Sequence, residues 1–209
     1  MARTSPTIVV FDIGKVLLDW DPRHLYRRIF PDSERMESFL REVLPTSWIL
    51  ETDRGKPFAD AVAERIMRFP DHADAIRAFD HRWLETVAGP IAGSVALLER
   101  LQARGVPTYS ITNFSAEKFE IARTAFPFLD SFRGIVVSGR ERLLKPDAAI
   151  YRTLFDRHAV DPADCLFIDD SAANVAAART LGMHAHHFEH AQGLAEALKH
   201  YGLLGQRYT

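Results

Sequence analysis

Short apolar runs recur along the chain, and a cluster of polar residues follows each of them. The runs are rich in β-branched and aromatic residues, which is typical of strands buried on both faces of a parallel sheet. Segments with helical spacing lie between them, and this alternation predicts a doubly wound parallel α/β sheet. The expected strands are Ile8–Phe11, Val106–Ile111, Ile135–Val137, Leu166–Ile168 and, more weakly, His184–Phe188, and the expected helices are Ser94–Arg104, Ser115–Ala125, Asp147–His158 and Ala172–Leu181.

The stretch from Pro22 to about Val87 has a different pattern, because it holds no strand-like run. Prolines and glycines divide it into segments with helical spacing. We interpret it as a helical insertion over 20–89, which interrupts an α/β unit made of 1–19 and 90–209. The expected helices are Arg23–Phe30, Ser33–Val43, Pro57–Phe69 and Asp71–Val87, and Gly89, Pro90 and Gly93 form the expected return linker.

Composition and charge exclude some classes of function but do not identify one. The 209 residues are 47% hydrophobic and 26% charged, which is ordinary for a soluble globular protein, and the net charge of −2 argues against a nucleic-acid partner. The apolar run Thr7–Phe11 is too short to span a membrane, so we expect no membrane partner and a cytoplasmic location. Cys165 is the single cysteine, which excludes an intrachain disulfide. The oligomeric state stays open, a homodimer included.

Asp12 directly follows the first predicted strand, and Gly14 comes two residues later. In a doubly wound sheet the ligand site lies at the carboxyl ends of the strands, so this carboxylate is expected there. Gly14 lets the chain turn sharply and brings a carbonyl oxygen close to a ligand. Taken alone, Asp12 is better explained by the capping of a turn.

Polar residues also follow the second strand and precede a later helix. Thr112 and Asn113 offer a hydroxyl and an amide that suit an anion. The alternative is that Asn113 or Ser115 caps the next helix, although Ser115 and Lys118 do not form a capping box. Lys145 stands just before Pro146 and a predicted helix. It is either a solvated charge or a fixed cation near the site.

Two adjacent carboxylates, Asp169 and Asp170, follow the fourth strand. Such a pair is costly beside an apolar run unless a cation or hydrogen-bond donors satisfy it. A hard divalent ion such as Mg²⁺ is a natural partner for these oxygens. The simpler alternative is an acidic turn in which Asp170 or Ser171 caps a helix.

The four clusters together are more specific than any one of them, because each ends a strand of the same predicted sheet. They supply an acidic nucleophile, a hydroxyl and amide cradle, a lysine and an acidic pair, which is the equipment of phosphoryl transfer through an aspartyl-phosphate. The segments FDIGKVLL, YSITN, LLKPDAAIY and FIDDSAANV resemble the motifs of the haloacid dehalogenase-like hydrolase superfamily in order and spacing. The resemblance covers essentially the whole chain.

That resemblance implies a Rossmann-like core and a helical cap, which is inserted after the first motif and closes over the site. It implies Asp12 as the nucleophile and Lys145 as a catalytic cation that holds the phosphoryl oxygens together with Thr112 and Asn113. Mg²⁺ would lie between the carboxylates of Asp12 and Asp170 and the carbonyl of Gly14, with Asp169 in its outer sphere or sharing it. The expected activity is a magnesium-dependent phosphatase of a small phosphorylated metabolite.

One position departs from the family pattern. Most phosphatases of the family carry a second aspartate, the general acid and base, two residues after the nucleophile, and this chain has Gly14 there. Such proton transfer typically contributes ~10²–10⁴-fold to the rate. Some family phosphatases also carry glycine at this position, so activity is not excluded. Asp19, Asp21 or a residue of the cap are the candidate substitutes.

Two other functions stay open. A 2-haloacid dehalogenase would use Asp12 to displace halide without a metal, and Arg41 lies near the spacing of the dehalogenase arginine. The acidic pair Asp169 and Asp170 opposes this reading, because unneutralised carboxylates would repel a carboxylate substrate. A non-catalytic binding protein is the second alternative, since fold does not imply function.

The remaining features receive structural interpretations. The histidines of the fifth strand region alternate in direction and have no cysteine nearby, so a transition-metal site is not expected. The tryptophans are expected in the helical insertion or at its contact with the core, and Cys165 is expected to be buried and inert. The histidines are His184, His186, His187 and His190, and the tryptophans are Trp20, Trp48 and Trp83.

Overall fold

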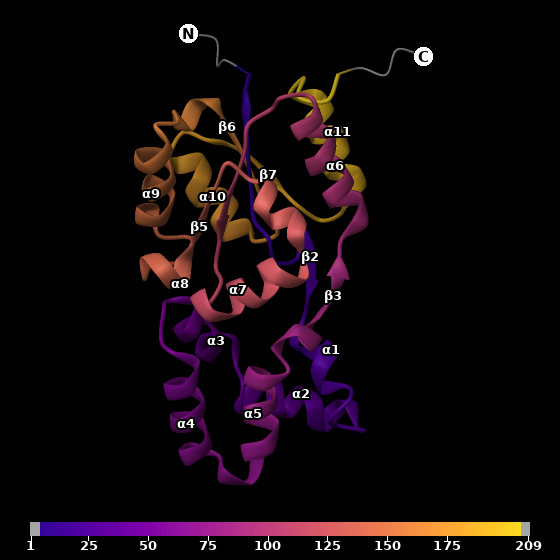
Figure 1. The fold of residues 1–209 in the computed structure, drawn as a ribbon, viewed down its shortest axis with the longest axis vertical. Coiled ribbons are helices and arrows are strands. Elements are labelled where there is room, and N and C mark those ends of the chain that lie inside the picture. Colours follow the sequence, from indigo (N-terminus) through magenta and orange to yellow (C-terminus); the bar gives the residue numbers. More distant parts are fainter. Residues whose placement is uncertain (1–4, 206–209) are drawn as a thin grey trace.

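A computed structural model describes residues 5–205 of the chain. Its centre is a five-stranded parallel sheet with the strand order β5-β4-β1-β6-β7. Helices cover both faces of this sheet (Figure 1), so the predicted doubly wound α/β fold is confirmed. The strands are β1 (Ile8–Phe11), β4 (Thr108–Thr112), β5 (Gly134–Val137), β6 (Cys165–Asp169) and β7 (His184–His187).

Successive residues of β1 face opposite sides of the sheet and belong to different hydrophobic clusters. Val9 and Phe11 pack in one cluster with leucines of α6 (Ala92–Ala103) and α11 (Ala191–His200). Val10 packs in the other cluster with residues of α9 (Ala148–His158) and α10 (Ala172–Thr180). Burial on both sides explains why the strands have no polar alternation. The other helices of this part are α7 (Ala116–Ala125) and α8 (Ser138–Glu141).

The register of the sheet brings the polar strand ends together. Phe11, the last residue of β1, lies opposite Ser110 of β4 and Ile168 of β6. The backbone N–H of Asp12 donates to the carbonyl of Ile168 at 2.8 Å. Asp12 and Asp169, the residues that follow these paired positions, therefore lie on neighbouring strands at one edge of the sheet.

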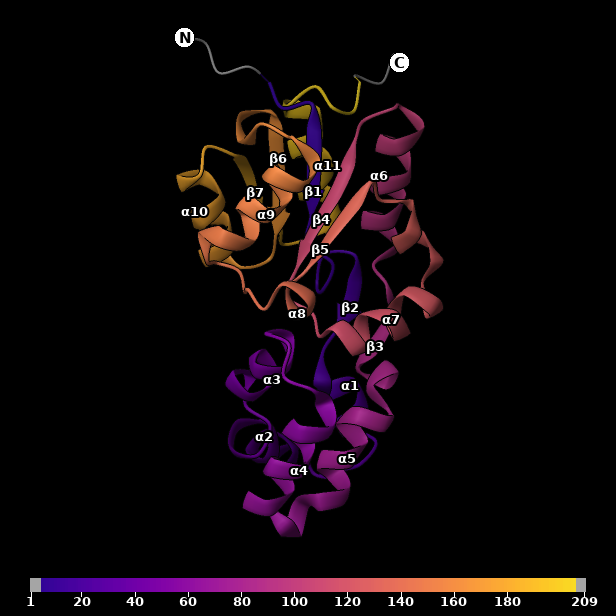
Figure 2. The same cartoon turned by 60° about the vertical axis from the view of Figure 1, so that its left-hand side comes forward.

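A layer of five helices occupies the other end of the molecule, below the sheet in Figure 2. Its core is aromatic: the ring of Tyr26 lies 4.9 Å from that of Phe39, and the ring of Phe79 lies 5.7 Å from that of Trp48, between centroids. We call this segment the helical layer. It consists of α1 (Pro22–Tyr26), α2 (Ser33–Glu42), α3 (Thr46–Asp53), α4 (Phe58–Arg68) and α5 (Ala73–His81), with short 3-10 turns at Pro70–His72 and Trp83–Thr86.

Two details of this region differ from the expectation. The segment between Pro45 and Gly55 forms α3, which the sequence pattern did not predict as a helix. The expected return linker is wrong in part, because β3 (Val87–Pro90) pairs with β2 (Leu18–Trp20) in an antiparallel ribbon. Neither strand shows a strand pattern of its own, because each is only three or four residues long. Their pairing joins segments that lie far apart in the sequence.

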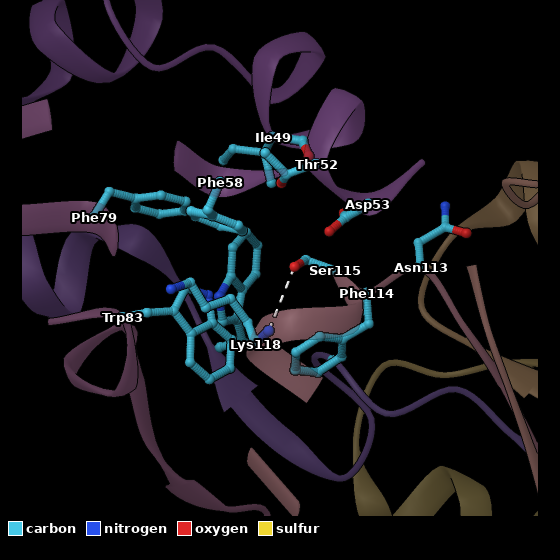
Figure 3. Close-up of a pocket in the computed structure, with 12 residues that line it drawn as sticks. Ile49, Thr52, Asp53, Phe58, Phe79, Trp83, Asn113, Phe114, Ser115 and Lys118 are labelled. Atoms are coloured by element: carbon cyan, nitrogen blue, oxygen red, sulfur yellow. Dashed lines mark hydrogen bonds between the residues drawn. The ribbon is translucent and has the colours of Figure 1, made fainter. Parts of the chain in front are cut away.

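A pocket lies between the helical layer and the carboxyl ends of the strands (Figure 3). It encloses about 430 Å³ of space between atoms, its open mouth included. Aromatic and aliphatic side chains form most of its wall, and a few polar groups interrupt them. The apolar residues are Trp20, Ile49, Phe58, Phe79, Trp83 and Phe114, and the others are Gly14, Thr52, Asp53, Asn113, Ser115 and Lys118.

Candidate active site

Asp12 lies directly after β1, where its side chain is almost wholly buried. Its Oδ1 atom accepts a hydrogen bond of 2.7 Å from the backbone N–H of Ile13 and lies 2.8 Å from Nζ of Lys145. The carboxylate is thus held at the edge of the sheet by the chain that follows it and by a cation from another segment. This is the position that the sequence pattern predicted for it.

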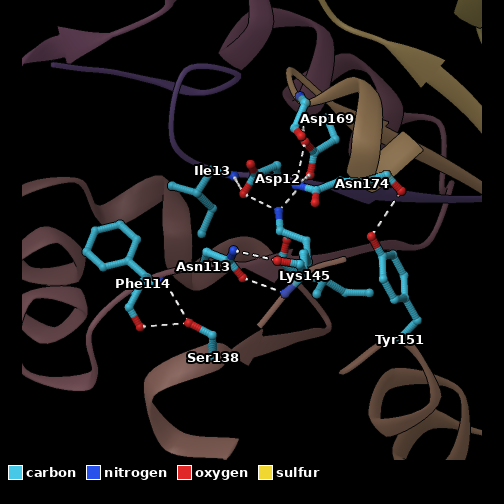
Figure 4. Close-up of polar contacts among 11 residues, drawn as sticks. Asp12, Ile13, Asn113, Phe114, Ser138, Lys145, Tyr151, Asp169 and Asn174 are labelled. Carbon is cyan, nitrogen blue, oxygen red and sulfur yellow. Dashed lines mark hydrogen bonds and ion pairs between the residues drawn. The ribbon is translucent and has the colours of Figure 1, made fainter. Parts of the chain in front are cut away.

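Lys145 is the centre of the polar network in Figure 4. Its side chain is 1% exposed, and besides Asp12 its Nζ contacts Oδ2 of Asp169 at 2.7 Å and the carbonyl of Ile111 at 2.9 Å. Asn113 fixes the backbone of Lys145 from both sides, accepting from its N–H at 2.8 Å and donating to its carbonyl at 3.1 Å. Lys145 is therefore a fixed cation of the site and not a solvated charge.

The acidic pair divides into a fully buried and a half-buried carboxylate. Asp169 accepts hydrogen bonds from the backbone N–H of Ser171 and from the Asn174 amide, in addition to its contact with Lys145. Asp170 is more exposed. Carboxylate oxygens of Asp12, Asp169 and Asp170 lie within 4.8 Å of one another, the one cluster of this kind among residues 5–205.

The charges of this cluster do not balance. Burial raises the pKa of Asp12 to about 7, an effect that Lys145 opposes and Asp169 reinforces. Burial and the neighbouring Asp169 also raise the pKa of Asp170. Burial lowers the pKa of Lys145, but its two carboxylate partners more than offset this, so it stays protonated. One cation thus faces three carboxylates, and a set of hard oxygen donors with excess negative charge fits Mg²⁺.

The other predicted residues lie around the same space. The Thr112 hydroxyl is buried and has no hydrogen-bond partner among the described residues, so it is available to a ligand. Gly14 lines the pocket, and a Cβ atom added there would meet no atom within 4 Å. Its φ lies outside the left-handed region, so glycine here leaves open space and does not serve a strained turn.

Neither aspartate considered as a substitute for the missing acid is free for that role. Asp19 is 57% exposed and pairs with His24 at 3.2 Å. Asp21 caps α1 by accepting from the backbone N–H of Arg23 at 2.8 Å, and it also contacts the Arg23 guanidinium. Both carboxylates serve the first turn of the helical layer.

The structure brings two further charged residues to the pocket that sequence reasoning missed. Asp53 ends α3, and Lys118 of α7 is buried with its Nζ 4.2 Å from the centre of the Phe58 ring and in an ion pair with Asp80. Both belong to segments that meet only in the folded chain. The one local signal is that Asp53 lies two residues before Gly55, whose positive φ turns the chain after α3.

The residues given structural interpretations add no charge to the carboxylate cluster, although Trp20 and Trp83 line the pocket. Arg41 is 68% exposed and pairs with Glu42. His187 contacts the carbonyl of Asp170 at 2.8 Å, while His190 caps α11 through its Nδ1 atom. Cys165 is buried, and burial raises the pKa of its thiol to about 12, as expected of an inert cysteine. Among the described residues, no helix is both long and apolar enough to cross a membrane.

Comparison with known proteins identifies relatives over most of the chain. A family model described as haloacid dehalogenase-like hydrolase matches residues 6–182. The sesquiterpene phosphatase astK of Aspergillus oryzae is 27% identical over 180 residues, which are 86% of this chain and 88% of that protein.

Solved structures of low sequence identity share the fold. A HAD family enzyme from Bacteroides thetaiotaomicron, in complex with magnesium and inorganic phosphate, is 20% identical with a TM-score of 0.64, over 88% of this chain and 95% of that one. L-2-haloacid dehalogenase from Xanthobacter autotrophicus, with chloropropionic acid covalently bound, is 17% identical with a TM-score of 0.63, over 93% and 83%.

Proposed function

Because the chain belongs to the haloacid dehalogenase-like hydrolases, we propose that it is a magnesium-dependent phosphatase that hydrolyses a small phosphorylated metabolite through an aspartyl-phosphate. In this proposal, residues 1–19 and 90–209 form the Rossmann-like catalytic core. Residues 20–89, which include the helical layer, form the cap. The A. oryzae relative, a phosphatase by name, supports this choice.

The observation that carries the proposal is the group of three carboxylates around one lysine. Mg²⁺ would be held by Asp12, Asp170 and the carbonyl of Gly14, with Asp169 beside it. A HAD family enzyme of the same fold was crystallised with magnesium and phosphate. When bound, Mg²⁺ supplies positive charge that neutralises the acidic cluster and the phosphoryl oxygens.

The chain's own residues then divide the chemistry among them. Asp12 attacks phosphorus, and its Oδ2 atom is the available nucleophile because both hydrogen-bonded contacts described above fall on Oδ1. Lys145 and the unpartnered hydroxyl of Thr112 bind phosphoryl oxygens. Asn113 binds the phosphoryl group as well and keeps Lys145 in place through its backbone.

The wall of the pocket indicates the class of leaving group. Six apolar side chains surround the space between the helical layer and the site. A sugar or nucleotide would leave its hydroxyl groups unpaired against them, whereas a compact apolar alcohol would bury its surface favourably. The sesquiterpene named for the A. oryzae relative is a molecule of that character. We therefore infer a phosphomonoester of an apolar alcohol as the preferred substrate.

The acidic pair also separates this proposal from the alternatives. A dehalogenase needs no metal, and its carboxylate substrate would meet the negative charge of Asp169 and Asp170. The dehalogenase neighbour, at 17% identity, shares the fold alone. A non-catalytic binding protein would not need Asp12, Lys145 and the pair to converge on one point.

A substrate panel tests the proposal. Purified protein is given aryl, alkyl, sugar and isoprenyl phosphates with Mg²⁺ or with chelator, and phosphate release is measured. In parallel, halide release from 2-haloacids is measured with chelator present. We expect magnesium-dependent phosphate release that is greatest for apolar alcohols. Halide release without metal would instead establish that the protein is a dehalogenase. Inactivity in both assays would favour a non-catalytic binding protein.

A further inference from the structure

The proposed phosphatase lacks a proton donor in the usual place. Position 14 is glycine, and the space where its side chain would extend is open. The nearby carboxylates Asp19 and Asp21 are engaged with His24 and with the start of α1. Departure of an alkoxide from phosphorus needs an acid, so another group must face this space from the opposite wall.

Asp53 lies on that wall. It is the last residue of α3 and lines the pocket together with Gly14 and Asn113, and its carboxylate points toward the core residue Ser115 in Figure 3. It comes from the helical layer, whereas Gly14 and Asn113 come from the carboxyl ends of β1 and β4. The pocket therefore places an acid across from the vacant position.

The backbone of Asp53 is fixed to the core, which fixes the point from which its side chain enters the pocket. The Ser138 hydroxyl donates to the carbonyl of Asp53 at 2.6 Å. Two residues later the chain turns at Gly55, whose φ is +97°, and a Cβ atom there would lie 2.7 Å from the carbonyl of Gly139. This close approach of backbone to backbone holds the end of α3 against α8.

We propose that Asp53 is the general acid and base of this enzyme, taking the role of the aspartate that position 14 lacks. The inference rests on the proposed phosphatase function. It adds to that function a catalytic residue outside the motifs by which the chain resembles its family.

The surroundings of Asp53 favour its protonated form near neutrality. Burial raises its pKa to about 7, and the negative charge of Asp12 acts in the same direction. The backbone of Ser115 and the charge of Lys145 act in the opposite direction. Lys118, the other cation of the pocket, is already paired with Asp80. An acid with a pKa near the working pH is suited both to give and to take a proton.

The two half-reactions then balance. As Asp12 bonds to phosphorus, the bond from phosphorus to the alcohol oxygen breaks, and that oxygen takes its electron pair and the proton of Asp53. The alcohol leaves, and Asp53 becomes a carboxylate. It next removes a proton from water, whose oxygen bonds to phosphorus while the bond from phosphorus to Asp12 breaks. Phosphate leaves with both aspartates in their starting states.

The experiment compares two substrates whose leaving groups need different amounts of help. Hexyl phosphate releases a poor leaving group, whereas p-nitrophenyl phosphate releases a good one. We expect Asp53→Asn to lower kcat/KM for hexyl phosphate ~10²-fold or more and to change that for p-nitrophenyl phosphate much less. Asp19→Asn is the matched control, because Asp19 is a nearby exposed carboxylate, and it should leave both rates unchanged.

A second variant keeps the test independent of folding defects. Adding Gly14→Asp to Asp53→Asn should restore hexyl phosphate turnover at least tenfold, since it returns an acid to the pocket. Equal losses on both substrates in Asp53→Asn, with no rescue, would overturn the role of Asp53 and leave the phosphatase assignment standing. Selective loss in Asp19→Asn would overturn it in favour of Asp19. A wild-type protein that releases phosphate from neither substrate would overturn both proposals.

Discussion

At the scale of the residue, Asp12 shows how the site opposes the stability of the fold. Its pKa in the folded protein is about 7, against an ordinary value of 3.8. The folded state therefore binds the proton more tightly than the unfolded state does, and the stabilisation from this group is present at low pH and lost as pH rises from ~4 to ~7. Above pH 7 the buried charge is a cost that Lys145 offsets only in part.

We accordingly expect Asp12→Asn to be more stable than the wild type at pH 8 without metal. An increase in Tm of ~2–4 °C corresponds to ~1 kcal/mol in a protein of this size. The difference should shrink at pH 5, where Asp12 is protonated. Thermal unfolding at both pH values with chelator present makes the comparison. A lower Tm for the variant at pH 8 would mean that the pair of Asp12 with Lys145 is net stabilising.

Gly14 gives a second prediction at this scale. A side chain at this position meets no atom within 4 Å and no left-handed backbone, so Gly14→Asp should fold with an unchanged circular-dichroism melt. In the otherwise wild-type protein we expect turnover of alkyl phosphates to rise more than that of activated aryl phosphates. Because Asp53 already supplies an acid in our proposal, the gain should be several-fold at most. Equal loss on both classes would show that a carboxylate here repels the phosphate.

Site residues placed by the ends of strands could be predicted from the sequence, whereas those placed by contacts between distant segments could not. Asp12 follows β1 and Asp169 ends β6, and the ends of neighbouring parallel strands meet at one edge of the sheet whatever the loops do. Asp53 carries no such signal, because its place depends on how α3 meets α8. For Lys145 the sequence left open a solvated charge or a fixed cation. Its burial between two carboxylates shows that it is a fixed cation, and no local sequence pattern encodes that burial.

At the scale of the element, α7 and α5 are joined by a buried contact beside the pocket. Lys118 of α7 pairs with Asp80 of α5, and its Nζ lies over the ring of Phe58. We expect Lys118→Met to keep the packing of the side-chain stem but lose the ion pair, lowering Tm by ~2–4 °C, or ~1 kcal/mol, and raising KM. Because the Met variant removes the lysine partner of Asp80, adding Asp80→Asn should recover part of the Tm. Additive losses would show that the two side chains do not interact.

Elements were predictable where burial imposed a pattern. The predicted ends of the five sheet strands lie within two residues of the observed ends. These strands were recognisable because both of their faces are buried. The β2–β3 ribbon was missed, since Gly89 and Pro90 are unfavourable strand residues and pairing comes from the distant Leu18–Trp20. The expected helix Asp71–Val87 is shorter, because α5 ends at His81 and a separate 3-10 turn over Trp83–Thr86 leads into β3.

At the scale of the whole molecule, metal binding should stabilise the fold, because the acidic cluster forms only when β1 and β6 are paired. With Mg²⁺ at about 100 times its Kd we expect ~2.7 kcal/mol, or a Tm increase of ~5–10 °C. Asp170→Asn should lose this shift, while Asp74→Asn, at a fully exposed carboxylate, should keep it. An equal shift in both variants would place the magnesium outside the cluster.

The measurement that tests the central claim most directly is phosphate release by the wild type and by Asp12→Asn, each with Mg²⁺ and with chelator. A phosphomonoester that the wild type hydrolyses in the substrate panel serves as the probe. We predict release by the wild type with Mg²⁺ alone and less than a few per cent of that rate in a folded Asp12→Asn protein. Hydrolysis that persists in chelator, or in the variant, would contradict a magnesium-dependent reaction with Asp12 as its nucleophile.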